Sequence, residues 1–302
     1  MPVQNNSNIP RRKFIALTAA AAGGSALMSF FPSDAGGQGR NMTIREAIDI
    51  IIKNIPVTPF SDTVDTVKSG NPDQLLKGIV TTSFATIEVI EKAAASGANF
   101  IVAHEPTFYN HRDETDWLQQ DGVYQYKKKL LDKHGIVVWR FHDYWHSDKP
   151  DGVLTGVLHM LGWEQYADTQ NQHIITIPGA SFNSIAKHVK ERMQIPSIKA
   201  IGDPAERCSR IVMLPGAAGG RAQIQAMETI KPDLLICGEL QEWETSEYVR
   251  DARAKGDKMA LMVLGHAVSE EPGMSWLVPW LQPKLPGITI THIPSKSPFT
   301  WY

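Results

Sequence analysis

The chain has 302 residues, of which 42% are hydrophobic and 21% are charged. This is enough apolar material for one large or two ordinary globular domains, and it excludes a disordered or fibrous protein. The formal net charge is only -2, so the overall charge attracts no polyanion, and we expect no nucleic-acid partner. Two cysteines are too few for a disulfide framework or a cysteine zinc site, so any metal must be held by histidines and carboxylates.

Residues 1–35 have the pattern of a twin-arginine signal peptide. A basic run at 11–13 precedes an almost uncharged stretch at 15–31, rich in Ala and Gly, and small residues at 33–35 offer a cleavage site. This pattern predicts export to the periplasm or the cell exterior. Because the apolar stretch is short for a bilayer span of about 20 residues, cleavage is favoured over a retained anchor, and we expect no membrane span in the mature form. The alternative is a chance arginine pair before a buried helix.

Helices and strands alternate through the first half of the chain. Apolar residues at three-four spacing predict an amphipathic helix from Thr43 to residue 55, with Thr43 and Glu46 as a capping box. After it the pattern predicts, in order, a strand, a helix, a strand, a helix and a strand, at 78–83, 85–97, 99–104, 122–135 and 136–141. Units of strand, helix and strand build a parallel sheet.

The alternation starts again after Gly162. Strands are predicted at 173–178, 210–215, 233–238, 259–266 and 287–293, and the helices between them at 181–193, 221–230 and 244–256. We therefore predict an α/β fold with mixed or parallel sheets. Its two α/β domains would span 36–165 and 166–302, behind a signal peptide at 1–35.

Histidines and acids gather at the carboxyl ends of three predicted strands, where an open α/β sheet lines its ligand crevice. His104 and Glu105 directly follow the first strand. His266 ends the third, and Glu270 lies in the first turn of the following helix. The second strand leads into a loop that holds His142, Asp143, His146 and Asp148. Imidazole with carboxylate suits zinc, iron, manganese or nickel, although each motif alone could be a solvated loop or a helix cap.

A fourth group of acids follows the strand at 233–238. Glu239, Glu242 and Glu244 are candidates for a general base or a substrate contact, and the alternative is an exposed helix start. Two metal ions held about 3.5–4 Å apart by His and carboxylate ligands would activate a water molecule for hydrolysis.

The motifs GANFIVAHEPTFY, DLLICGE, VLGHAVSE and IPSKSPF together resemble the Nif-three-like family (NGG-one-interacting factor three), whose members are also described as GTP cyclohydrolase type 2 homologues. The resemblance covers about residues 43–298. It implies two α/β domains, a dinuclear metal site in the cleft between them, and a toroidal homo-hexamer.

The resemblance also implies a ligand set for two divalent transition-metal ions: His104, Glu105, His146, His266 and Glu270. The last two match the family's Gly-His-x-x-x-Glu without change. Two of the five depart from the family pattern, because Glu105 replaces the second histidine of His-His-Pro and His146 replaces the acid of His-x-x-x-Asp. The exchange keeps three imidazoles and two carboxylates. It leaves open which ligand bridges, whether one or two ions bind, and whether Asp143 substitutes for His146.

The expected function is that of an exported metal-dependent hydrolase, which uses metal-activated water on a small polar substrate while Glu239 assists proton transfer. The alternative is a metal-binding oligomeric ring or scaffold without turnover, because fold does not fix function. A GTP cyclohydrolase role is less natural for an exported protein, since GTP is scarce outside the cytoplasm.

Overall fold

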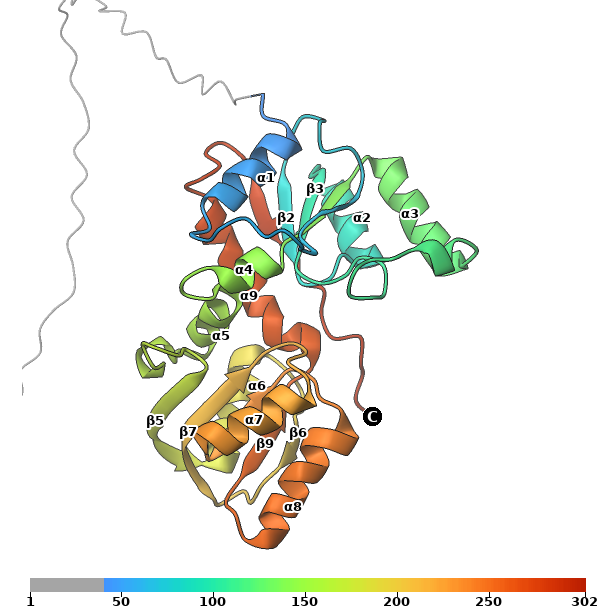
Figure 1. Ribbon diagram of the computed structural model, residues 1–302. Coiled ribbons are helices and arrows are strands. Elements are labelled where there is room, and N and C mark those ends of the chain that lie inside the picture. The colour runs from blue at the N-terminus through green and yellow to red at the C-terminus, as the bar shows by residue number, and fades with distance from the viewer. Residues whose placement is uncertain (1–40) are drawn as a thin grey trace, which may run out of the picture. The chain divides into compact units, whose positions relative to one another are not determined.

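The structure is a computed structural model that describes residues 41–302 (Figure 1). The predicted export signal lies outside these residues. Within them, the strands form two five-stranded sheets and helices connect the strands, so the predicted α/β fold is confirmed. No helix of this part of the chain is long and apolar enough to cross a membrane.

The first sheet has the strand order β1-β4-β3-β2-β10. Its strands are β1 (Val67–Ser69), β2 (Ile79–Thr82), β3 (Phe100–Ala103), β4 (Val137–Arg140) and β10 (Ile290–His292). All neighbouring pairs are parallel except β1 with β4. The three central strands follow the predicted positions, because each is a short run of mainly apolar and β-branched residues buried on both faces of the sheet.

Helices cover both faces of this sheet. Strand residues alternate in direction, so Phe100 and Val102 pack on one side with α1 (Ile44–Lys53) and α9 (His266–Leu281). Ile101 and Ala103 pack on the other side with α2 (Ile87–Ala95) and α3 (Gly122–His134). Figure 1 shows α1 and α9 on one side of the sheet and α2 and α3 on the other. The predicted capping box of α1 is present.

The second sheet has the order β5-β7-β8-β9-β6. Its strands are β5 (Ile174–Ser181), β6 (Lys199–Ile201), β7 (Arg207–Leu214), β8 (Leu234–Cys237) and β9 (Ala260–Val263). The pairs β7-β8 and β8-β9 are parallel, while both edge strands are antiparallel. On one face pack α5 (Gly152–Leu161) and α6 (Phe182–Met193), and on the other α7 (Gly220–Ile230) and α8 (Glu247–Lys255), which follows a π-helical turn at Glu242–Ser246.

The structure differs from the sequence prediction at the last strand. Residues 287–293 were expected to close the second half, but β10 pairs in parallel with β2 of the first sheet. The reason is α9, whose residues Met274, Leu277 and Leu281 pack in the core under the first sheet and so carry the chain back to it. The predicted boundary at residue 165 stays a prediction.

Candidate metal centre

The predicted ligands come from the carboxyl ends of neighbouring strands and from one helix. His104 and Glu105 follow β3. His142 and His146 follow the adjacent strand β4, His142 as the N-cap of the short helix α4 (Asp143–Ser147) and His146 in its last turn. His266 and Glu270 begin α9, where the spacing of four residues places both side chains on one helix face.

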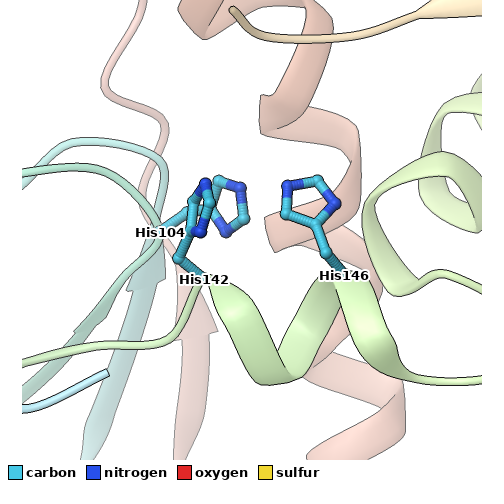
Figure 2. Close-up of side chains that lie close together, drawn as sticks. All are labelled: His104, His142 and His146. Carbon is cyan, nitrogen blue, oxygen red and sulfur yellow. The ribbon is translucent and has the colours of Figure 1, made fainter. Parts of the chain in front are cut away.

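Three imidazoles lie together at the centre of the site (Figure 2). The ring of His104 is 4.7 Å from that of His142 and 4.9 Å from that of His146, measured between centroids. The rings of His142 and His146 are also 4.9 Å apart. One nitrogen of each can serve as a ligand atom, with these atoms all within 4.8 Å of one another, so a single ion can contact all three.

Two carboxylates and a fourth imidazole complete the cluster. Glu105 Oε1 lies 3.3 Å from His266 Nε2 and 3.7 Å from His142 Nε2. Glu270 Oε2 lies 3.1 Å from His266 Nε2 and 3.8 Å from His104 Nε2. The structure therefore brings all five predicted ligands together and adds His142 as a sixth residue. We call these six residues the His/Glu cluster.

Every histidine of the His/Glu cluster is oriented through its Nδ1 atom, which donates to a protein oxygen. The acceptors are Phe141 O for His104 (3.0 Å), Asp143 for His142 (2.8 Å), Asp151 for His146 (3.0 Å) and Glu239 for His266 (3.1 Å). Such outer partners fix the tautomer and leave Nε2 as the free nitrogen of each ring.

Polar atoms inside the His/Glu cluster lack aligned hydrogen-bond partners. His104 Nε2, His266 Nε2 and Glu270 Oε2 are all buried and have no aligned hydrogen-bond partner, although Glu270 Oε2 lies 3.1 Å from His266 Nε2. Buried unpaired polar atoms are costly, and a cation at their common centre would satisfy them. The donor set of imidazoles and carboxylates therefore fits a divalent transition metal.

The protonation states favour the same conclusion. Burial, together with the neighbouring His146 and His142, holds the pKa of His104 well below its usual value, so this imidazole is neutral as a ligand must be. Burial opposes the ionisation of Glu105, but contact with His266 and the charges of nearby histidines lower its pKa to about 2. Burial lowers the pKa of His266, but the carboxylates of Glu105 and Glu270 raise it more, to about 11. A positive charge is thus favoured where the ligands converge.

A buried arginine explains why a carboxylate can occupy position 105. Arg140 is fully buried on β4, beside the end of β3. Its Nη2 donates to Glu105 Oε2 (3.4 Å), and its Nε donates to His104 O (3.1 Å). One oxygen of Glu105 is therefore held by Arg140, and the other faces the histidines.

The geometry favours His146 over Asp143 as the ligand from the second loop. Both carboxylate oxygens of Asp143 are engaged, one with His142 Nδ1 and the other with Thr63 Oγ1 (2.7 Å) and Val64 N (3.1 Å). Asp143 therefore orients His142 from outside the His/Glu cluster.

The sequence analysis named His142 in the loop after the second strand but not as a ligand, and it did not assign Arg140 or Asp151 to the site. The spacing of His142 and His146 by four residues was a usable signal, because a helix places such a pair on one face. The roles of Arg140 and Asp151 had no local signal, since they depend on pairing between strands and on the path of the loop.

The three acidic residues after β8 have different contacts. Glu239 contacts His266 Nδ1 and is half exposed. Glu242 forms an ion pair with Lys199 (3.0 Å), and Glu244 packs against Gly220. Of the three, only Glu239 contacts the His/Glu cluster.

A cavity of about 1740 Å³ opens on the His/Glu cluster. Five residues of the cluster line it, as do Glu239, His173 just before β5 and the C-terminal segment at 295–301. The cavity exceeds the roughly 300–1,000 Å³ that ordinary small-molecule sites occupy.

This chain is similar to proteins of one known family. The family model for Duf34/NIF3 (NGG1p interacting factor 3) matches residues 42–298. No curated protein sequence matches the chain.

Solved structures share the fold at low sequence identity. The hypothetical protein SA1388 of Staphylococcus aureus has a TM-score of 0.69 and 18% identity, with 86% of this chain and 99% of that chain covered. A Bacillus cereus protein related to NIF3 has a TM-score of 0.70 and 13% identity, with 87% and 100% covered. Reduced HcgD from Methanocaldococcus jannaschii has a TM-score of 0.60 and 17% identity, with 83% and 97% covered.

Because the family model matches residues 42–298, which are most of the chain, this chain belongs to the Duf34/NIF3 family.

Proposed function

We propose that this protein is a metal-dependent hydrolase whose His/Glu cluster binds two divalent transition-metal ions at the floor of the cavity. The observation that carries the proposal is the convergence of three imidazoles and two carboxylates, with His266 in contact with both carboxylates and several of the inner atoms buried without an aligned hydrogen bond. Zinc, iron, manganese and nickel all accept this donor set.

Two overlapping groups of ligands would hold the two ions. His104, His142 and His146 form a group of three imidazoles, and His104 also forms a group with Glu105 and Glu270. Both of these carboxylates lie close to His266. Glu105 Oε1 lies 3.7 Å from His142 Nε2 and 3.3 Å from His266 Nε2, so it could contact either ion.

Ions bound here would lower the pKa of a water molecule and stabilise negative charge on a hydrolytic transition state. The protein's own residues do the remaining work. Arg140 and the Nδ1 partners of the four histidines hold the ligands in place. Glu239 lines the cavity while contacting His266, so it can accept and return a proton beside the reacting group.

The proposed substrate class rests on the family resemblance and on the donor set. We propose a small polar molecule, and the link to GTP cyclohydrolase type 2 makes cyclic amidines one of the classes to screen beside phosphoesters and amides. The resemblance also supports a homo-hexamer, and the twin-arginine pattern supports export by that route to the periplasm or the cell exterior.

Metal analysis with a substrate screen tests the proposed hydrolase. The purified protein should contain close to two ions per chain and hydrolyse at least one of these classes. In the double variant His104→Ala/Glu270→Ala, both the ions and the activity should be lost while the circular dichroism spectrum is kept. The control is His159→Ala, because His159 is exposed and remote from the ligand set. Full metal with no turnover on any class would favour the metal-binding ring without activity.

Export is tested separately. Replacement of Arg11 and Arg12 by lysine should leave the precursor in the cytoplasm, because the twin-arginine pathway requires the arginine pair. Normal export of this variant would contradict the assignment.

A further inference from the structure

Three lysines line the large cavity, and they differ in their partners. Lys199 pairs with Glu242 at 3.0 Å, and Lys296 pairs with Glu88 at 3.6 Å. Lys127 forms no ion pair within residues 41–302, although it is the most buried of the three, with 5% of its surface exposed. A buried ammonium group without a carboxylate partner is unusual and requires an explanation.

Lys127 lies on the inner face of α3. It follows Tyr124 and precedes Leu131 in the set of residues that this helix buries, at positions where an amphipathic helix normally has apolar side chains. Its Nζ donates one hydrogen bond, to Thr107 O at 2.7 Å. The rings of Phe108 and Tyr109 lie 5.8 and 5.4 Å from the same atom. An ammonium group has three donors, so this hydrogen bond leaves two of them for another partner.

Asp113, the acid whose charge acts on Lys127, already contacts other groups. Asp113 Oδ2 lies 3.4 Å from Lys68 and 3.8 Å from Arg140, while its Oδ1 accepts from Phe108 N. Burial lowers the pKa of Lys127 to about 8, and the charge of Asp113 only partly opposes this. The site therefore favours an additional negative charge beside Lys127.

The residue whose carbonyl accepts from this ammonium has a second unpaired group, its hydroxyl. Thr107 is fully buried, lines the cavity, and its hydroxyl has no hydrogen-bond partner. It is only two residues from Glu105, so its Cα is at most about 7 Å from that of a proposed metal ligand. An ammonium group and a hydroxyl are the donors that bind a carboxylate or phosphate oxygen.

We propose that Lys127 and Thr107 form a subsite that binds an anionic group, carboxylate or phosphate, of a molecule held in the cavity beside the His/Glu cluster. This proposal rests on the proposed function in one respect: the bound molecule is taken to be the substrate of the proposed hydrolase. A substrate anchored here by its anion would present a neutral part within reach of the metal ligands.

Calorimetric titration with inorganic phosphate and, separately, with acetate tests this subsite. The full chain is used as purified, with the metal content of each sample measured. We expect Lys127→Gln, which keeps a donor for Thr107 O, to lose affinity at least tenfold while keeping its metal. The matched control is Lys129→Gln, at an exposed lysine of the same helix, which should bind as the unaltered chain does. Loss for phosphate alone identifies a phosphoryl ligand, and loss for acetate alone identifies a carboxylate.

The variant Thr107→Val keeps the test decisive if Lys127→Gln folds poorly. It removes an unpaired buried hydroxyl, so the melting temperature should stay or rise, whereas the affinity for the anion should fall several-fold. A purely structural role of Thr107 would not separate these two readouts. The proposal is overturned if neither anion binds the unaltered chain, or if Lys127→Gln and Thr107→Val bind both anions normally. Metal content reports on the proposed function independently, because neither residue belongs to the His/Glu cluster.

Discussion

At the scale of single residues, the two departures from the family's ligand pattern each have a matching partner. Glu105 is held by the fully buried Arg140, and His146 is held by Asp151. A carboxylate beside a buried guanidinium and an imidazole beside a carboxylate are each favourable, whereas the reverse arrangement would leave like charges together. The partners therefore support a rearranged site in which both exchanged residues keep a ligand role.

Gly216 is required by the position of Glu270. Its φ is +62°, and a Cβ placed on it would lie 1.9 Å from Glu270 Oε1. We predict that Gly216→Ala displaces Glu270 and lowers the metal content, measured by mass spectrometry after desalting. Gly219→Ala is the control, because φ is +82° there but nothing lies within 4 Å of the added Cβ. Equal metal content in the two variants would contradict this prediction.

Lys127 gives a pH dependence of stability with a defined sign. Its pKa is lowered by burial from 10.5 to about 8 in the folded protein, so the unfolded chain binds more protons between these values. The free energy of unfolding should therefore rise with pH across this window, by at most about 3 kcal/mol. Urea denaturation from pH 7 to pH 10.5 should show this rise relative to Lys127→Met. A constant difference between the two proteins over that range would exclude the predicted contribution of Lys127.

At the scale of elements, α4 positions two histidines although it has only five residues. Its start depends on Asp65, whose carboxylate accepts from the backbone N–H groups of His142, Asp143 and Tyr144 at 2.8, 3.0 and 2.9 Å. This carboxylate lies on the segment before β1, so a distant part of the chain fixes the loop after β4.

Removal of this cap should affect both stability and metal binding. We predict that Asp65→Ala costs about 1–2 kcal/mol of unfolding free energy and weakens metal binding, because His142 and His146 lose their fixed positions. Thr86→Ala removes the cap of α2, where Thr86 Oγ1 accepts from Val89 N, and should reduce stability without affecting the metal. Titration of a chelator against each variant measures the metal affinity. Unaltered metal affinity in Asp65→Ala would show that α4 is held by other contacts.

The central strands could be predicted from the sequence because β2, β3, β4, β8 and β9 are short runs of mainly apolar and β-branched residues between turns. Their carboxyl ends therefore also revealed the residues at 104–105 and 266. The edge strands β1 and β6 have three residues each, which is too short for a pattern. The helix α5 buries residues around most of its circumference, so it lacks the polar face that would have revealed its period.

At the scale of the whole chain, α9 connects the two sheets and the site. Its first turn has His266 and Glu270, and its later turns pack under the first sheet. It also packs closely on α5, since a Cβ on Gly156 would lie 2.4 Å from Pro272 O and one on Gly273 would lie 2.5 Å from Val153 Cα. This packing between distant segments, which brings the ligands from both halves together, has no counterpart in a local pattern. The sequence therefore predicted which residues are candidate metal ligands better than it predicted the residues that hold them in place.

The oligomeric state stays a prediction from the family resemblance. Several large aromatic side chains are exposed, among them Trp117, Trp243, Phe299 and Trp301, and such groups are enriched at protein interfaces. We predict that light scattering on the purified protein gives the mass of six chains. A monomer at micromolar concentration would contradict the assembly.

The most direct test of the central claim is a crystal structure with anomalous diffraction recorded at the absorption edges of zinc, iron, manganese and nickel. We predict two anomalous peaks about 3.5–4 Å apart, one among His104, His142 and His146 and the other beside His266 and Glu270, with Glu105 contacting at least one of them. Ligand bonds to nitrogen and oxygen should measure about 2.0–2.2 Å. The absence of any peak within bonding distance of these six residues, in protein supplied with the metals during expression, would contradict the account.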